Sequence, residues 1–303
     1  MSMNNRPIWK LRDWIRDNDE YYHKLNWKYL SSNSRAVQLL MRPENYDKID
    51  WMYLSSNESD DALELLMRTE NYDKIDWRLL SKNSNPYAVK LLKDNQDKID
   101  WQLLSLNTND EAMEFLIRPE NKDKINWFYL AFNSNSTAVR LLEENPNYFD
   151  WSDLSFNSNT DAVKLLLKTE NKNKINWNNL NINENDLALD LLFKNPYYIK
   201  HELLCFNNNP RVIPFLLLNE NNDKIEWSYL SNNKNAVPIL EKKENRNKIN
   251  WTYLSSNPSI FILDYEAMKR NNQDFYEDLI KEVLKPSRVL KERYYDYLEE
   301  LFG

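Results

Sequence analysis

Apolar and polar residues recur along the chain in a period that tryptophan marks. The marker positions are Trp27, Trp51, Trp77, Trp101, Trp127, Trp151, Trp177, His201, Trp227 and Trp251, so the spacing alternates between 24 and 26 residues. The residue two before each marker is apolar, and the residue three after it is Leu. A fixed period of this length is typical of tandem repeat proteins, whose neighbouring units bury a shared core.

Each period predicts two short helices. Asp or Asn directly precedes the marker in eight repeats and is expected to cap the first helix. Asn stands six residues after every marker, where we expect it to end that helix in the left-handed conformation, as Asn does where Gly is absent. A second helix carries an Ala-Val-x-Leu-Leu pattern, for example over residues 88–92, and ends near another Asn such as Asn95.

Such short helices cannot bury their apolar faces alone, which predicts an all-α solenoid, a superhelical stack of about ten two-helix repeats. We assign residues 1–26 to an N-terminal cap, 27–258 to the repeats and 259–303 to a C-terminal helical cap. That cap is expected to hold helices over 264–284 and 290–301, separated by Pro286. We expect the indole rings of successive repeats to lie against each other in a continuous interior.

The alternation of period and the eighth repeat are the two irregularities. In the middle repeats the extra two residues follow the second helix, as a comparison of residues 65–71 with 91–95 shows. The eighth repeat has His201 for Trp and Cys205 at the small position, with prolines in its second helix. We expect the stack to bend near residues 196–214; His201 and Cys205 alone are a weak metal signal.

Composition excludes several kinds of chemistry. The one glycine is Gly303, whereas phosphate-binding loops, dinucleotide fingerprints and nucleophile elbows need internal glycines. Cys205 is the only cysteine, there are two histidines, and no apolar run is long enough to cross a membrane. We therefore expect an intracellular, non-secreted, non-catalytic protein without cofactor or metal. The net charge of −7, with both signs interleaved, disfavours nucleic acid.

The Lys-Ile-Asp-Trp-x-x-Leu-Ser-x-Asn pattern resembles a repeat family of giant DNA viruses of the mimivirus group. The similarity extends to the ends, at residues 7–15 and 278–288, and covers nearly the whole chain. Departures are Tyr148 and Tyr198 in place of the usual Lys, and the lost Trp of the eighth repeat. The resemblance implies a viral source and a place in the cytoplasm of the infected host cell, and it implies no enzymatic activity.

The position five after the marker is the candidate binding stripe, because it is polar in the end repeats and apolar in most middle ones. It lies beside the position one after the marker, where Phe128 stands. The expected partner-binding residues are Leu106, Phe128, Phe132, Phe156, Ile182 and Phe206. The alternative is that these side chains pack as satellite core against neighbouring loops.

The Lys three before the marker, as at Lys48 and Lys124, is the other candidate surface. It could form a basic ridge for phosphates, but acids next to it favour a self-neutralised surface. We therefore predict a monomeric scaffold that binds a host or viral protein along exposed helices. The alternatives are a nucleic-acid-binding solenoid and a structural virion component that self-associates.

Overall fold

The computed structural model describes residues 6–218 and 221–271, which fall into two compact units. The larger unit comprises residues 12–260 and holds the repeats; the smaller pairs residues up to Leu11 with those from Phe261 onward. The architecture is an all-α stack of helix pairs, as the periodicity predicted.

The first helix of each repeat begins at the marker residue. These helices are α3 (Trp27–Ser31), α5 (Trp51–Ser55), α7 (Trp77–Ser81), α9 (Trp101–Leu104), α11 (Trp127–Phe132), α13 (Trp151–Leu154), α15 (Trp177–Ile182), α17 (His201–Leu204), α19 (Trp227–Leu230) and α21 (Trp251–Ser256). The predicted caps are confirmed: the carboxylate of Asp76, for example, accepts the backbone N–H of Leu79 at 2.8 Å. Lys200, before α17, makes no such bond.

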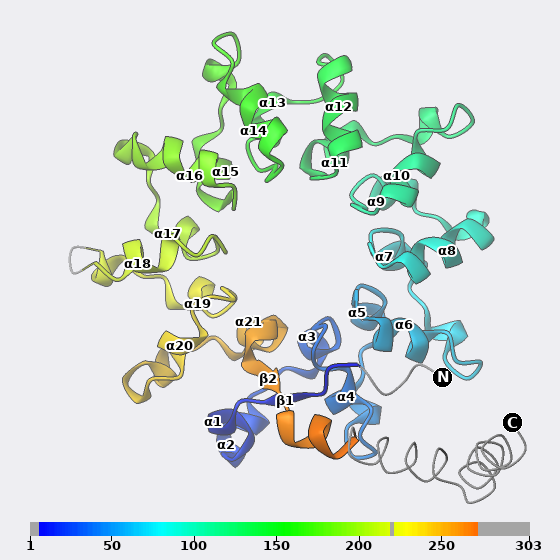
Figure 1. Ribbon diagram of the computed structural model, residues 1–303, viewed down its shortest axis with the longest axis vertical. Helices are drawn as coiled ribbons and strands as arrows, with labels where there is room; N and C mark the ends of the chain where they lie inside the picture. Colours follow the sequence, from blue (N-terminus) through cyan, green and yellow to red (C-terminus); the bar gives the residue numbers. More distant parts are fainter. Residues whose placement is uncertain (1–5, 219–220, 272–303) are drawn as a thin grey trace, which may run out of the picture. The chain divides into compact units, whose positions relative to one another are not determined.

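The second helices vary more in length. They are α4 (Val37–Leu40), α6 (Asp60–Leu66), α8 (Pro86–Asp94), α10 (Asp110–Leu116), α12 (Ser136–Glu144), α14 (Thr160–Leu167), α16 (Asp186–Phe193), α18 (Val212–Leu216) and α20 (Val237–Leu240). Short 3₁₀ turns link repeats: η1 (Tyr46–Lys48), η2 (Tyr72–Lys74), η3 (Gln96–Lys98), η4 (Lys122–Lys124), η5 (Lys172–Lys174), η6 (Pro196–Tyr198), η7 (Asn222–Lys224) and η8 (Lys243–Lys248). First helices such as α7, α11 and α15 lie on the inner side of the unit, and their partners α8, α12 and α16 on the outer side (Figure 1).

The core consists of aliphatic side chains between the helices, not of stacked indoles. The Leu three after each marker and the Ala that opens the second-helix pattern are almost fully buried. The marker tryptophans are only half-buried. Within the described residues no two of them are in ring contact, so the expected indole interior is wrong.

The Asn six after each marker forms a hydrogen-bonded ladder through the stack. The Nδ2 of Asn157 donates to the carbonyl oxygens of Ala131 and Asn133 in the preceding repeat, at 2.9 and 2.8 Å. Its Oδ1 accepts the backbone N–H of Asn159 at 2.9 Å. The donating residues, each to the preceding repeat, are Asn57, Asn83, Asn107, Asn133, Asn157, Asn183, Asn207, Asn233 and Asn257.

These asparagines therefore link neighbouring repeats and do not end the first helices in the left-handed conformation, as the sequence had suggested. Asn133 has φ −76° and ψ 116°, and no described residue has a positive φ. The predicted left-handed helix end is therefore wrong. Asn is needed because its amide supplies two N–H donors and an acceptor, which satisfy three buried backbone groups at once.

Where serine stands two positions before the ladder asparagine, its hydroxyl group adds a second link between repeats. Ser105 Oγ donates to the carbonyl of Trp101 at 3.0 Å and accepts the backbone N–H of Asn126, in the next repeat, at 3.0 Å. A hydroxyl can serve both roles at once, whereas the expectation from sequence was only that a small side chain lets helices approach.

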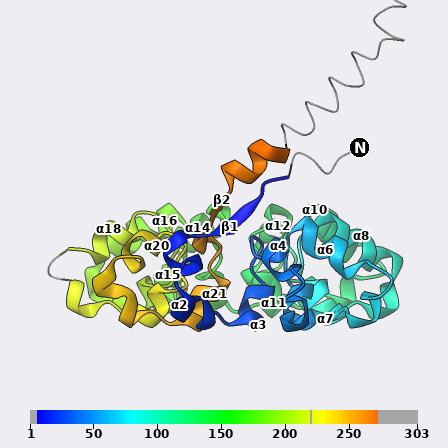
Figure 2. The ribbon, with the colours of Figure 1, turned by 90° about the horizontal axis from the view of Figure 1, so that it is seen from below.

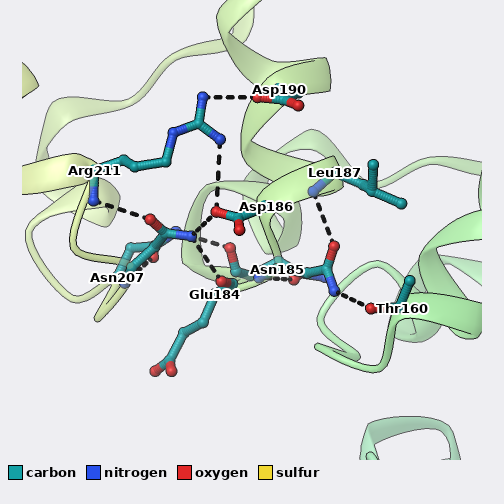
Figure 3. A network of polar contacts seen from close by, with 10 residues as sticks. Thr160, Glu184, Asn185, Asp186, Leu187, Asp190, Asn207 and Arg211 are labelled. Carbon is teal, nitrogen blue, oxygen red and sulfur yellow. Dashed lines mark hydrogen bonds and ion pairs between the residues drawn. The ribbon is translucent and has the colours of Figure 1, made fainter.

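A further asparagine, two residues after the ladder position, joins the starts of neighbouring second helices. Asn209 Nδ2 donates to the carbonyl of Glu184 at 3.0 Å and to the carboxylate of Asp186 at 2.8 Å. At this interface Arg211 also bonds Asp190 at 2.7 Å (Figure 3). These exposed ion pairs add little free energy, so the amide bonds hold the register here.

The stack closes on itself. α3 lies beside α21, and Asn33 Nδ2 donates to the carbonyl oxygens of Ser255 and Asn257 at 3.0 and 3.1 Å. The backbone N–H of Asn26 donates to Ser255 Oγ at 2.8 Å. The two bonds of the Asn33 amide are those that join every pair of consecutive repeats, so the ten ladder asparagines form an unbroken circle (Figure 1). The ends of the stack therefore meet, whereas the expected superhelical stack has a separate cap at each end.

The N-terminal segment of the larger unit completes the tenth repeat. After α21 the chain continues through η9 (Pro258–Ile260) without forming a second helix. The helices α1 (Asp13–Arg16) and α2 (Asp19–His23) supply the missing partner, with Trp14 and Tyr21 packed on Trp251 at centroid distances of 6.1 and 5.3 Å. Arg12 pairs with Glu241 at 3.2 Å. Residues expected to cap repeat 1 therefore join the two ends.

The smaller unit is an antiparallel strand pair. β1 (Trp9–Leu11) pairs with β2 (Phe261–Leu263), with Trp9 opposite Leu263 (Figure 2). A helix follows at residues 265–271, capped by Asp264. It is the start of the helix expected over 264–284; the remainder, and the helix expected over 290–301, lie outside the described residues. Within the described residues no helix combines the length and apolar character needed to cross a bilayer.

Candidate functional site: the exposed face of the first helices

The exposed face of each first helix carries the positions one, two and five after the marker. These residues are half-buried or exposed, whereas positions three, four and six are buried. The candidates predicted from the sequence all lie on this face: Leu106, Phe132, Ile182 and Phe206 are half-buried, and Phe128 and Phe156 are 52% and 39% exposed. The face looks away from the second helices, which cover the opposite side of each first helix.

Three of the predicted residues form what we call the phenylalanine cluster. The ring of Phe132 lies 5.1 Å from that of Phe128 and 5.5 Å from that of Phe156, in edge-to-face geometry. Phe128 and Phe132 come from α11 and Phe156 follows α13, so the cluster spans two repeats. Edge-to-face contacts hold the rings in place and leave much of Phe128 and Phe156 open to solvent.

Phe206 belongs to a separate group, the tyrosine cluster. Its ring stacks on Tyr229 at 4.2 Å and lies 6.2 Å from Tyr253. Sequence reasoning missed both tyrosines. The signal was present in the position two after the marker, which is Tyr in five repeats: Tyr29, Tyr53, Tyr129, Tyr229 and Tyr253.

Charges are segregated along this face. Among positions one, two and five of repeats 1–3 the charged residues are Lys28, Arg78 and Lys82, all basic. Among the same positions of repeats 4–8 they are Asp153 and Glu202, both acidic. Asp153 is half-buried, and this burial, followed by the nearby Asp150, raises the pKa of its carboxyl group. Within the described residues its carboxylate has no hydrogen-bond or ion-pair partner.

Most of the lysines three before the markers are bound within the structure. Lys48 Nζ lies 4.3 Å from the ring centroid of Trp27, in the preceding repeat, and 3.1 Å from Asn45 Oδ1. The same lysine–indole contact, at 4.0–4.4 Å, recurs in the pairs Lys74–Trp51, Lys98–Trp77, Lys124–Trp101, Lys174–Trp151 and Lys248–Trp227. These six lysines thus lie on an aromatic face, and most of them also bond an amide oxygen, whereas Lys24, before the first marker, pairs with the acid Glu20.

The two tyrosines that replace lysine occupy the same place. Tyr198 stacks on Trp177 at 4.0 Å with an interplanar angle of 7°, and Tyr148 lies 4.8 Å from Trp127. The departures from the repeat pattern therefore exchange a cation for an aromatic ring over the same indole face, and the contact between repeats is kept.

The eighth repeat shows no break in the ladder. Asn207 donates to Asn181 and Asn183 at 2.8 and 2.9 Å, and Asn233 donates to Cys205 and Asn207 at 3.1 and 2.8 Å. These distances match those elsewhere, so the ladder runs through this repeat without interruption; the bend expected near residues 196–214 stays a prediction. His201 stacks near Phe215 and bonds Asn221 Oδ1 at 2.9 Å, and the described residues contain no group of three metal-ligating side chains.

Restoring tryptophan here is expected to stabilise the protein. His201 Nε2 takes the amide oxygen that the lysine binds in other repeats, so Lys224 has neither an indole nor this oxygen. His201→Trp should place Lys224 over a ring, as Lys124 lies over Trp101, and raise the unfolding free energy by roughly 0.5–2 kcal/mol. Urea denaturation measures it. In the His201→Trp protein, the further change Lys224→Met should remove part of the gained unfolding free energy, whereas in the original protein it should have no such effect. A His201→Trp protein that is less stable than the original would contradict this account.

Cys205 is a structural thiol. It is completely buried, and burial raises the pKa of the thiol to about 11. At pH 8 we expect native protein to react with iodoacetamide at least roughly 100-fold more slowly than protein unfolded in urea, because the thiolate is the reactive form. Mass spectrometry of the alkylated product measures both rates. Equal rates would mean that the repeat opens readily.

Comparison with known proteins identifies no relative for this chain: no family model, curated protein or solved structure matches it.

Proposed function

We propose that this protein is a non-catalytic interaction scaffold that binds a protein partner on the exposed face of its first helices. The observation that carries the proposal is the phenylalanine cluster, in which side chains that could have been buried are left exposed across two repeats. Contiguous exposed aromatic surface on a rigid repeat frame is typical of protein-binding sites. The family resemblance suggests that the partner belongs to a giant virus or to the cytoplasm of its host cell.

The alternative of nucleic-acid binding has less support. Six lysines of the repeat column are engaged by indole rings, and the chain has a net charge of −7. A phosphate-binding surface needs free cations. Binding to nucleic acid that falls steeply with salt and is weakened by Lys124→Glu would favour this alternative. Lateral self-association detected by light scattering would favour a virion component.

The double substitution Phe128→Ser and Phe156→Ser tests the scaffold function. Since both rings are substantially exposed, we expect the melting temperature to fall by only a few degrees, while capture of protein partners from infected-cell lysate is lost. Tyr87→Ser is the matched control, because this aromatic residue is 54% exposed on the outer helix α8. A collapse of the melting temperature would show instead that the rings belong to the core.

A further inference from the structure

We propose that the phenylalanine cluster and Asp153 together form a site for a cationic side chain, arginine or lysine, that the protein partner presents between apolar residues. This inference rests on the proposed function and specifies the chemistry of the partner. The site is built from α11, α13 and the residue Phe156, which stands three positions after Asp153.

The first argument is the unpaired carboxylate. Asp153 is half-buried, and Phe156 follows it in the turn that ends α13, where the backbone N–H of Phe156 donates to the carbonyl oxygen of Asp153 at 3.0 Å. Within the described residues no donor bonds its carboxylate, and Asp150, the charged group that raises its pKa, has the same sign. Taking a carboxylate partly out of water without a partner costs free energy, which an incoming cation would recover.

The second argument is the absence of a cation from the exposed positions of these repeats. No Lys or Arg occupies positions one, two or five of repeats 4–8, although Lys28, Arg78 and Lys82 occupy them in repeats 1–3. The apolar part of the face is thus acidic only. A partner with positive charge is complementary to it, and an acidic partner is repelled.

The third argument is a precedent within the same chain. Lys Nζ groups lie on indole faces at 4.0–4.4 Å, and most of them also bond an amide oxygen. A ring with an oxygen beside it is therefore the arrangement by which this protein holds cations between repeats. The phenylalanine cluster with Asp153 offers the same two components, with the cation missing.

The test is selection of a random peptide library on the immobilised full-length protein. We expect enriched peptides to carry Arg or Lys flanked by apolar residues. Replacing that basic residue of the peptide by Gln should weaken binding roughly 10- to 100-fold, and so should Asp153→Asn in the protein. The two changes together should lower the affinity no further than either change alone. Asp161→Asn, the same change on the second helix of this repeat, α14, should leave affinity unchanged.

The outcomes separate the two proposals. Enriched peptides that lack basic residues, or an unchanged affinity for Asp153→Asn, would overturn the cation site while leaving the scaffold function intact. If no peptide is enriched, or if the Phe128→Ser, Phe156→Ser protein selects the same peptides, both proposals fail. Because the Asp153 carboxylate lacks a partner, Asp153→Asn should leave the melting temperature unchanged or raise it, so a failure to bind cannot be attributed to unfolding.

Discussion

Replacing Asn157 by alanine should lower the free energy of unfolding by roughly 3–6 kcal/mol, the largest effect expected of any single polar substitution in the described part of the chain. The amide group of Asn157 satisfies the carbonyls of Ala131 and Asn133 and the backbone N–H of Asn159. All three bonds lie where the side chain is completely buried. Alanine leaves these groups without partners and without water, so each contributes its desolvation cost.

Urea denaturation followed by circular dichroism measures this effect. Asn178→Ala is the matched control, because Asn178 is exposed on α15 and its substitution should change the free energy by less than about 0.5 kcal/mol. Asn157→Asp should be nearly as harmful as alanine, since a carboxylate keeps the acceptor but loses both donors. A loss below about 1 kcal/mol for Asn157→Ala would mean that water replaces the amide and that the ladder is not a main source of stability.

The local structure followed from the sequence where one residue decides it. An Asp or Asn before the marker caps a helix because its side chain reaches the N–H groups of the first turn, and this depends on few neighbours. The ladder could not be inferred in the same way. Asn133 is compatible both with a left-handed helix end and with an extended backbone, and only the carbonyl oxygens of the preceding repeat favour the second.

The candidate site was foreseen in part for a similar reason. Phe132 and Phe156 stand at the same position of consecutive repeats, so periodicity alone brings them together. Phe206 is separated from Phe156 by Ile182 and lies instead against Tyr229, which stands at a different position of the next repeat. Contacts between unlike positions depend on the rotation between repeats, which the sequence does not state.

Closure of the stack depends on the same rotation, but two features of the sequence pointed to it. The pattern of residues that precedes the second and third markers is already present before the first, as Tyr22, Lys24, Leu25 and Asn26. Tyr22 lies against Trp27 at 5.9 Å, just as Tyr46 lies against Trp51. The last repeat, in contrast, has no second-helix pattern after Asn257. The last repeat therefore lacks a second helix, and the residues before the first marker can supply one.

If the circle is closed in solution, Asn33→Ala should destabilise the protein about as much as Asn157→Ala, although Asn33 belongs to the first repeat. In the closed form its Nδ2 satisfies two carbonyls 222 and 224 residues away, and its Oδ1 accepts the N–H of Arg35. In an open stack only the bond to Arg35 would remain, and the loss would be about 1 kcal/mol. The same denaturation experiment measures both variants under identical conditions.

A second substitution, in the N-terminal helices that pack on the last repeat, makes this test specific for closure of the circle. Trp14→Ala removes a ring that packs on Trp251 across the chain ends, and it should cost roughly 3–5 kcal/mol only if the ends meet. In an open chain Trp14 would have no aromatic partner from the last repeat, and its loss would affect α1 and α2 alone. Small effects of both Asn33→Ala and Trp14→Ala, beside a large effect of Asn157→Ala, would show that the ladder holds the repeats together but that the circle is open.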